Sequence, residues 1–127
     1  MKLSFFRIAL LFTFVLSELI SQPAAQPAAQ VQRIPQFESD DVKVWKAVIM
    51  PNAPLTMHTH QHARVIVALE GGTMKIVSEN GSSETQKWET GKAYWLSAEE
   101  GKKPHADAND GTKPIEVMVV EIKNAKL

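Results

Sequence analysis

Short apolar runs separated by turn residues occupy the chain from Phe37 onward, and this pattern restricts the possible folds more than any other feature of the sequence. The runs are rich in residues that favour strands, and no stretch shows a convincing helical period. They cover residues 42–50, 55–69, 73–77, 84–88, 93–96 and 115–122. Because antiparallel strands this short must share a core, the sequence predicts an all-β domain, either a small sandwich or a barrel.

Two local patterns refine this expectation. The dipeptide Asn80-Gly81 lies between two of the runs, and both of its residues tolerate a positive φ. It therefore predicts a hairpin with a type I′ or related turn that pairs residues 73–77 with residues 84–88. The final run, 115–122, is largely apolar on both faces, which predicts a strand that is covered on both sides.

Length and composition limit the possible functions. The 127 residues suffice for one domain with a modest core. Fourteen basic and fourteen acidic residues give a formal net charge of zero, so no overall field favours nucleic acid or an anionic membrane surface as a partner. The chain has no cysteine, which excludes disulfides, thiolate catalysis and cysteine-type zinc sites. Histidine and carboxylate side chains are then the only strong metal ligands.

The first 21 residues differ in character from the rest of the chain. Lys2 and Arg7 carry positive charge beside an apolar run over residues 8–16, which predicts a secretory signal peptide and an exported protein, periplasmic or secreted. The apolar run is too short for a stable membrane span, and the alternative is a buried N-terminal helix. Residues 22–36 repeat the pattern Gln-Pro-Ala-Ala and predict an extended spacer, so the folded domain is expected at residues 37–127.

Histidine is scarce and concentrated. Three of the four histidines stand at alternate positions, His58, His60 and His62, and the fourth is His105. Alternate side chains of an extended segment project from one face, so these imidazoles could hold a metal ion. The neighbouring residues favour a strand here. His62 projects from the same face and could supply a fourth nitrogen. However, it lies two residues beyond His60, a distance of about 6.6 Å along an extended chain, so we expect it deeper in the structure or in contact with the ligands rather than with the metal.

These histidines carry a resemblance to the cupin superfamily, whose first motif is Gly-x5-His-x-His-x3or4-Glu-x6-Gly. His58 and His60 match the paired histidines, and Gly71 matches the closing glycine. Asn52 stands at the opening glycine. Arg64 stands where the family has its glutamate ligand, so a cation replaces the usual carboxylate.

The second motif of the family, Gly-x5-Pro-x-Gly-x2-His-x3-Asn, is also partly present. Gly91 matches its first glycine, Ser97 takes the proline position, and His105 and Asn109 reproduce the ending His-x3-Asn. Three more residues than the pattern allows lie before the histidine. The resemblance covers residues 57–109 and implies a double-stranded β-helix, the cupin-type jelly-roll barrel, as a single domain.

The resemblance also implies a metal centre. His58, His60 and His105 are expected to bind a divalent ion such as Mn, Fe, Ni, Zn or Cu, with positions left open for water or substrate. The alternative is a barrel that has lost its metal and keeps the histidines as hydrogen-bonding walls of a pocket. The family includes oxygenases, isomerases, sugar binders and storage proteins, so it does not assign a reaction.

Arg64 would repel a bare dication, and three arrangements resolve the conflict. An anionic ligand, a carboxylate or a phosphate, could bridge the metal and the arginine. The metal could be absent. Alternatively, the side chain could turn to the barrel rim and pair with Glu70, Glu99 or Glu100. A set of three histidines without a glutamate also resembles the metal site of the thiol dioxygenases of the same superfamily. Those enzymes hold iron with three histidines and use an arginine to bind a carboxylate. The likeness is in the arrangement of the site and not in the sequence.

The remaining patterns concern packing. Trp88, Tyr94 and Trp95 are expected in the core or at an interface; one of the last two should face outward, which suggests a homodimer. Residues 98–103 read as a solvated loop beside the pocket.

We therefore expect an exported metal-binding protein. It could be a metal-dependent oxygenase or isomerase of a small anionic or sugar-like compound. The alternatives are a non-catalytic module that binds a metal or small molecule, and a purely structural barrel. Asp107 adjoins the second motif, but no partner for it is evident, so no general base is assigned and enzyme activity stays open.

Overall fold

The computed structural model describes residues 31–53 and 56–124. Within these residues, eight strands and one short helix form two sheets, so the expectation of an all-β domain is confirmed. The predicted signal peptide and residues 22–30 of the predicted spacer lie outside the described residues. In the described part of the chain, no helix is long and apolar enough to cross a membrane.

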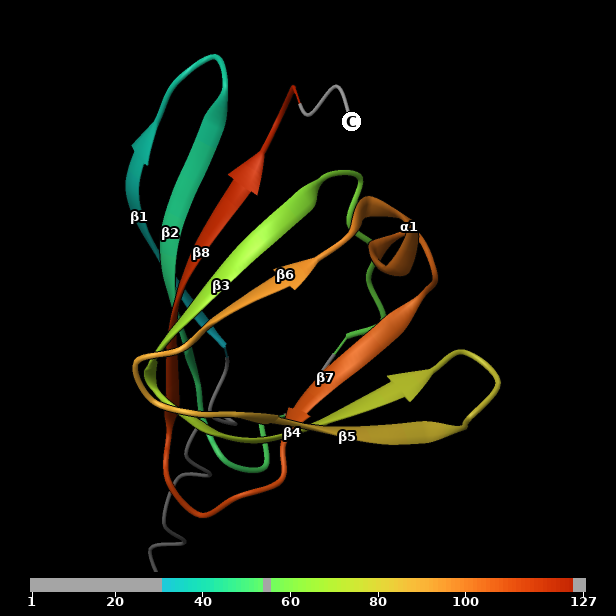
Figure 1. The fold of residues 1–127 in the computed structure, drawn as a ribbon. Coiled ribbons are helices and arrows are strands. Elements are labelled where there is room, and N and C mark those ends of the chain that lie inside the picture. The colour runs from blue at the N-terminus through green and yellow to red at the C-terminus, as the bar shows by residue number, and fades with distance from the viewer. Residues whose placement is uncertain (1–30, 54–55, 125–127) are drawn as a thin grey trace, which may run out of the picture.

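The two sheets face each other across the interior, and every pair of neighbouring strands is antiparallel (Figure 1). The larger sheet has the order β1 (Gln32–Glu38), β2 (Val42–Ile49), β8 (Ile115–Ile122), β3 (Ala63–Glu70) and β6 (Ala93–Leu96). The smaller sheet has the order β5 (Ser83–Trp88), β4 (Gly72–Ser78) and β7 (His105–Asn109). Helix α1 (Ala98–Gly101) lies in the connection from β6 to β7.

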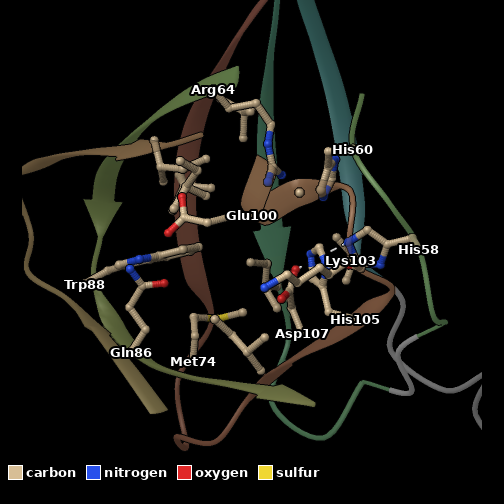
Figure 2. A pocket seen from close by; sticks show the side chains of 18 of the residues that line it. His58, His60, Arg64, Met74, Gln86, Trp88, Glu100, Lys103, His105 and Asp107 are labelled. Atoms are coloured by element: carbon tan, nitrogen blue, oxygen red, sulfur yellow. Dashed lines mark hydrogen bonds and ion pairs between the residues drawn. The ribbon is translucent and has the colours of Figure 1, made fainter. Parts of the chain in front are cut away.

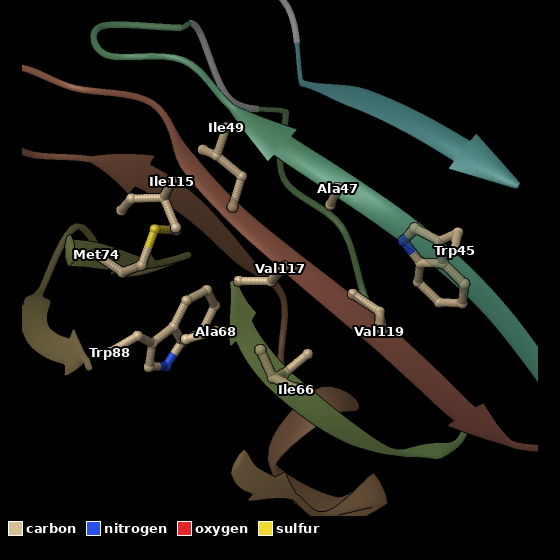
Figure 3. Packing of buried hydrophobic residues seen from close by; sticks show 10 residues of the cluster. All are labelled: Trp45, Ala47, Ile49, Ile66, Ala68, Met74, Trp88, Ile115, Val117 and Val119. Carbon is tan, nitrogen blue, oxygen red and sulfur yellow. The ribbon is translucent and has the colours of Figure 1, made fainter. Parts of the chain in front are cut away.

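The hydrophobic core lies between the sheets and draws on both (Figure 3). Ile115, Val117 and Val119 alternate along β8 at the centre of the larger sheet and are almost fully buried. Met118 and Val120 on the opposite face are only half-buried. The final strand is therefore covered on its inner face, and the expected cover on both sides is only partial.

The predicted hairpin is present, and of the type I′ or related turns expected for it, type I′ itself is not the one formed. β4 and β5 pair in register from Gly72 opposite Trp88 to Val77 opposite Ser83. Only Gly81 of the turn has a positive φ, 82°. A type I′ turn needs a positive φ at both central residues, so the four-residue connection replaces it, and a single glycine meets its backbone requirement.

Strand β1 begins inside the segment that the sequence assigned to the spacer. Its residues are all exposed, so it lacks the apolar alternation that identifies a buried strand. It is held instead by backbone pairing with β2, from Gln32 opposite Val48 to Glu38 opposite Lys43. The expected domain start at Phe37 thus lies within a paired strand. Whether the residues before it are needed for folding stays a prediction.

The predicted solvated loop over residues 98–103 contains the one-turn helix α1. Ser97 caps it: the Ser97 hydroxyl accepts from the backbone N–H of Glu100, and the Glu100 carboxylate accepts from the backbone N–H of Ser97 at 2.9 Å. This reciprocal pair is a capping box, a pattern readable as Ser-x-x-Glu in the sequence. The extra residues between Ser97 and His105 are accommodated by this helix.

Three motif positions have clear backbone reasons. A Cβ on Gly71 would lie 2.2 Å from the carbonyl oxygen of Trp88, so only glycine fits there. Asn52, at the position of the opening glycine, has a φ of 55°, a conformation that asparagine tolerates better than most residues. Buried Asn109 donates to the carbonyls of Ile49 and Lys113, which fastens the end of β7 to the end of β2.

The two aromatic residues of β6 face opposite ways, as expected. Tyr94 packs against the core, and its hydroxyl accepts a 2.7 Å hydrogen bond from the backbone N–H of Glu89. Trp95 is 49% exposed on the outer face. The homodimer suggested by this outward tryptophan stays a prediction.

Candidate metal centre and cavity

The segment that carries the paired histidines is extended but is not part of the long strand expected over residues 55–69. β3 begins only at Ala63. His58 instead forms an isolated bridge with His105 of β7: the N–H of His58 donates to the carbonyl of His105 at 2.9 Å, and the reverse bond is 3.1 Å. The N–H of His60 donates to the carbonyl of Gly101 at 2.7 Å. These three bonds place the histidines of both motifs side by side.

The contact between His60 and helix α1 depends on the absence of a side chain. Gly101 is buried, and a Cβ there would lie 2.9 Å from the Cβ of His60. Only glycine therefore lets the helix approach the histidine segment closely enough for the backbone hydrogen bond.

His58, His60 and His105 each offer one nitrogen to a common point, and these nitrogens lie within 4.8 Å of one another (Figure 2). Nitrogen ligands of one metal ion at about 2.1 Å lie about 3 to 3.5 Å apart, so a small inward movement would complete the set. His62 does not belong to this cluster, and it does not line the adjoining cavity.

The hydrogen bonds of the imidazoles prepare them for a metal. Nδ1 of His58 lies 2.9 Å from the carbonyl oxygen of Thr56, and Nδ1 of His105 lies 2.7 Å from that of Lys103. A carbonyl oxygen only accepts, so each Nδ1 carries the proton and donates it. In the neutral ring, Nε2 then has a free lone pair, and such outer partners also fix the orientation of metal-binding histidines.

His60 carries the nitrogen that is best suited to bind a metal. Its Nε2 is buried and has no hydrogen-bond partner among the described residues. Burial lowers the pKa of His60 to about 3, and the positive charges of Arg64, His58 and His105 act in the same direction. The imidazole is therefore neutral at physiological pH, which is the form that binds a metal. The donor set fits a divalent transition metal.

Arg64 lies beside the cluster and points into the interior from β3 (Figure 2). It is only 7% exposed, so the alternative that placed it on the barrel rim, paired with a surface glutamate, is wrong. Its Nε is buried without a hydrogen-bond partner among the described residues. Burial lowers the pKa of Arg64, and the nearby charges of Asp107 and Glu121 oppose this effect.

The cluster and Arg64 line one cavity of about 1110 Å³. Its apolar part includes Ile66, Met74, Trp88, Val117 and Val119, all of which also belong to the core. Its polar part includes, besides the histidines and Arg64, the side chains of Arg33, Glu84, Gln86, Glu100, Lys103 and Asp107. The cavity therefore has a polar region beside the histidines and an apolar region beside the core.

Asp107 is the polar residue that sequence reasoning left without a role. Its Oδ2 lies 3.5 Å from Nε2 of His58, and its side chain lines the cavity. A usable signal was present, because Asp107 stands two residues after His105 and so shares its face of the strand. A carboxylate is thus near the cluster although the glutamate of the first motif is missing.

The comparisons with known proteins concern the fold. No protein-family model matches the chain, and no curated protein matches it. Among solved structures, a cupin domain from Bordetella pertussis Tohama I is similar with a TM-score of 0.67 at 20% identity, covering 78% of this chain and 99% of that one.

Two further solved structures have a fold similar to that of this chain. A protein with a double-stranded β-helix domain from Klebsiella pneumoniae is similar with a TM-score of 0.57 at 19% identity, covering 79% of this chain and 84% of that one. An RmlC-like cupin family protein from Methanocaldococcus jannaschii is similar with a TM-score of 0.56 at 14% identity, covering 75% of this chain and 82% of that one. The chain therefore has the cupin double-stranded β-helix fold, and the predicted fold class is confirmed.

Proposed function

We propose that this cupin-fold chain binds a divalent transition metal through His58, His60 and His105. The observation that carries the proposal is the convergence of three imidazole nitrogens within 4.8 Å at the wall of a cavity. Two of the rings donate Nδ1–H to carbonyls, and the third has a buried Nε2 that has no hydrogen-bond partner within residues 31–53 and 56–124. The Nδ1–H bonds leave Nε2 of His58 and His105 as the nitrogens that a metal would take once the rings are neutral, and Mn, Fe, Ni, Zn and Cu all accept imidazole.

We propose further that the cavity takes a small anionic ligand beside this centre. Arg64 is buried and charged, and its Nε has no hydrogen-bond partner in the part of the chain that the structure describes. A cation next to a metal needs a negative charge between them. A carboxylate or phosphate that contacts both would supply it, since a guanidinium binds such groups in a planar, bidentate way. Asp107 supplies part of the compensating charge, but it is already engaged with His58.

The proposed centre has consequences for chemistry. A bound transition metal would supply Lewis acidity and, for a redox metal, electron transfer. The chain's own part is to orient the anion through Arg64 and to exclude water with the apolar wall of the cavity. Asp107 lies close enough to the histidines to accept a proton, which favours a metal-dependent oxygenase or isomerase as a second candidate beside a non-catalytic binding module.

The experiment that tests the metal proposal is a titration of the purified protein with Zn²⁺ and Mn²⁺, together with elemental analysis of protein from its native host. We expect His58→Ala, His60→Ala and His105→Ala each to abolish tight binding. His62→Ala is the matched control, because His62 lies outside the cluster, and it should retain binding. Equal losses in all four variants, or no binding by the unaltered protein, would remove the proposal.

We also propose that the protein is exported after removal of residues 1–21. The positive charge and short apolar run at the start of the chain support this, and they lie outside the described residues. N-terminal sequencing of the protein from its native host should begin near Gln22. A sequence that begins at Met1 would contradict export by cleavage.

A further inference from the structure

The outer face of the larger sheet, which points away from the cavity, carries a row of apolar side chains. Residues directly opposite each other in paired strands lie on the same face of a sheet, and successive residues of a strand lie on opposite faces. Because Ile66, Val119 and Trp45 point into the core, their neighbours along the chain point outward. The pairing aligns one outward residue from every strand: Trp95 of β6, Val65 of β3, Val120 of β8, Val44 of β2 and Phe37 of β1.

A second row lies beside the first and is almost as apolar. It consists of Ala93 of β6, Val67 of β3, Met118 of β8, Lys46 of β2 and Ile34 of β1. Lys46 is the only charged residue of the two rows, and its ammonium donates to the carboxylate of Glu116 at 2.9 Å. The charge of Lys46 is therefore already paired within the chain. We call the ten residues of the two rows the outer patch.

The outer patch is accessible to solvent in the single chain. Phe37, Trp95 and Ile34, on the two edge strands, are 61%, 49% and 40% exposed. In Figure 1 the smaller sheet and α1 lie on the other side of the larger sheet, so none of the described elements covers the patch. Soluble proteins rarely expose large continuous apolar patches, and those that do usually bind a partner there.

The segment before β1 is poorly suited to cover the outer patch. Residues 22–30 consist only of glutamine, proline and alanine. These side chains offer little apolar area, whereas the patch presents two aromatic rings and several branched aliphatic side chains. A partner from outside the chain therefore suits the patch better.

A second copy of this chain matches the outer patch in symmetry and charge. β8 is the central strand of the five, and the first row has a valine and then an aromatic ring on each side of Val120. A two-fold axis parallel to β8 therefore lays Trp95 of one copy over Phe37 of the other. The same axis keeps the two Lys46 side chains apart, because β2 of one copy then faces β3 of the other. The contact needs no charge from the partner.

The outer face is also large enough for a specific interface. Five strands about 4.8 Å apart span about 24 Å, and a strand of about six residues is about 20 Å long. The flat footprint is then roughly 500 Å² per copy, or roughly 1,000 Å² for both, which is about the minimum for a specific protein–protein interface. The aromatic side chains at the two edges add to this area.

We propose that two copies of this chain form a homodimer in which the outer patches pack face to face about a two-fold axis parallel to β8. Trp95 of each copy packs against Phe37 of the other, and the half-buried valines between them become fully buried. The cavity lies on the other side of the larger sheet, so each copy keeps a complete cavity. The inference goes beyond the proposed function and requires neither the metal nor the anion.

The test is the mass of the chain in solution, measured by sedimentation equilibrium over a dilution series. The chain over residues 22–127 should have twice the mass of one copy. Trp95→Lys and Phe37→Glu each place a charge against an apolar surface, so each should raise the Kd of dimerisation by about 100-fold or more. Ser83→Lys and Ser83→Glu, at an exposed position of the smaller sheet, are the matched controls and should leave this Kd unchanged.

A mixture of the two variants tests how the copies face each other. Trp95→Lys and Phe37→Glu chains, combined in equal amounts, should form a dimer again. The introduced lysine of one copy then faces the introduced glutamate of the other, and the second edge keeps its original pair of aromatic rings. Circular dichroism should show that each variant is folded, because both residues are exposed in the single chain.

A second measurement uses the unaltered chain and does not depend on any variant. Trp45 and Trp88 are 8% and 7% exposed, so Trp95 is the tryptophan that a quencher such as acrylamide reaches in the single chain. Quenching of the tryptophan fluorescence should therefore increase when the protein is diluted and the dimer dissociates. Phe37→Glu should show the strong quenching at every concentration.

Several results would overturn the inference. They are the mass of one copy at every concentration, a dimer that persists in both Trp95→Lys and Phe37→Glu, and a mixture of the two variants that does not dimerise. The same measurements on the chain over residues 1–127 test a different occupant. If residues 1–21 protect Trp95 from the quencher while the mass stays that of one copy, the N-terminal segment covers the patch and the homodimer is wrong.

Discussion

Nε2 of His58 lies 3.5 Å from Oδ2 of Asp107, which joins the segment before β3 to strand β7 beside the proposed metal centre. The hydrogen bond to Asp107 raises the pKa of His58 against the effect of burial, and the carbonyl of Thr56 acts in the same direction. Burial opposes ionisation of Asp107, but the bond to His58 and the positive charges of His105 and His58 hold the pKa of Asp107 below its ordinary value. The two shifts agree, and they favour an ion pair in the metal-free protein.

This pair predicts how metal binding depends on pH. A raised pKa keeps the proton on His58 to higher pH, and that proton competes with the metal for Nε2. Metal affinity should therefore fall by about tenfold for each pH unit below the pKa of His58. Asp107→Asn lowers this pKa, so the fall should begin at lower pH. The measurement is the apparent Kd for Zn²⁺ between about pH 5 and 8. Asp110→Asn, at an exposed position, is the control, and an unchanged midpoint in Asp107→Asn would contradict the prediction.

His60 predicts the acid sensitivity of the metal-free fold. Its pKa falls from an ordinary value of 6.5 to about 3 on folding. Between these values the unfolded chain takes up a proton that the folded protein does not, so the free energy of unfolding should decrease as the pH falls through this window. The contribution is at most about 1.4 kcal/mol per pH unit. Urea unfolding at several pH values should show a shallower slope for His60→Gln. His62→Gln is the matched control, and equal slopes for His60→Gln and the unaltered protein would refute this.

Arg64 predicts a reciprocal change in metal and anion binding. Arg64→Glu restores the residue that the cupin motif has at this position; it removes a repulsive charge and adds a carboxylate ligand. Metal affinity should rise by about tenfold or more, because like charges several ångströms apart repel by about 1–3 kcal/mol at an effective dielectric near 20. Affinity for pentanoate should be lost, because a carboxylate now faces a carboxylate. Arg64→Gln, which removes the charge without adding a ligand, separates the two effects. Unchanged binding of both metal and pentanoate in Arg64→Glu would show that Arg64 does not act on this site.

Strand β1 predicts where the folded domain begins. A chain that starts at Val31 should be as stable as the mature protein, whereas one that starts at Phe37 loses most of the pairing with β2. It also loses Arg33, whose guanidinium lies 5.7 Å from the ring centroid of Trp45. We expect a loss of at least about 2 kcal/mol in the free energy of unfolding, because several backbone hydrogen bonds disappear. Urea unfolding of both truncated chains provides the comparison. Equal stability would restore Phe37 as the domain start.

Local pattern accounts for the part of the fold that the sequence predicts. The runs that became β2, β4, β5, β6 and β8 alternate apolar and polar residues or lie beside turn residues, and those signals depend only on near neighbours. The sequence pattern did not predict β1, because all of its residues are exposed and it has no buried apolar face. The sequence pattern did not predict β7 either, because His105–Asn109 contains no β-branched or large apolar residue. Its strand conformation is imposed by pairing with β4.

The sequence by itself determined the kinds of ligand atom and the resemblance that led to the cupin fold, since residue identity and spacing along the chain carry both. Only the tertiary structure decided which side chains meet. The bridge between His58 and His105, the burial of Arg64 and the position of Trp88 on the opposite sheet all depend on two sheets closing around one cavity. Such contacts join residues far apart in the chain, and no local pattern specifies them, because their energies arise only when the whole core has formed.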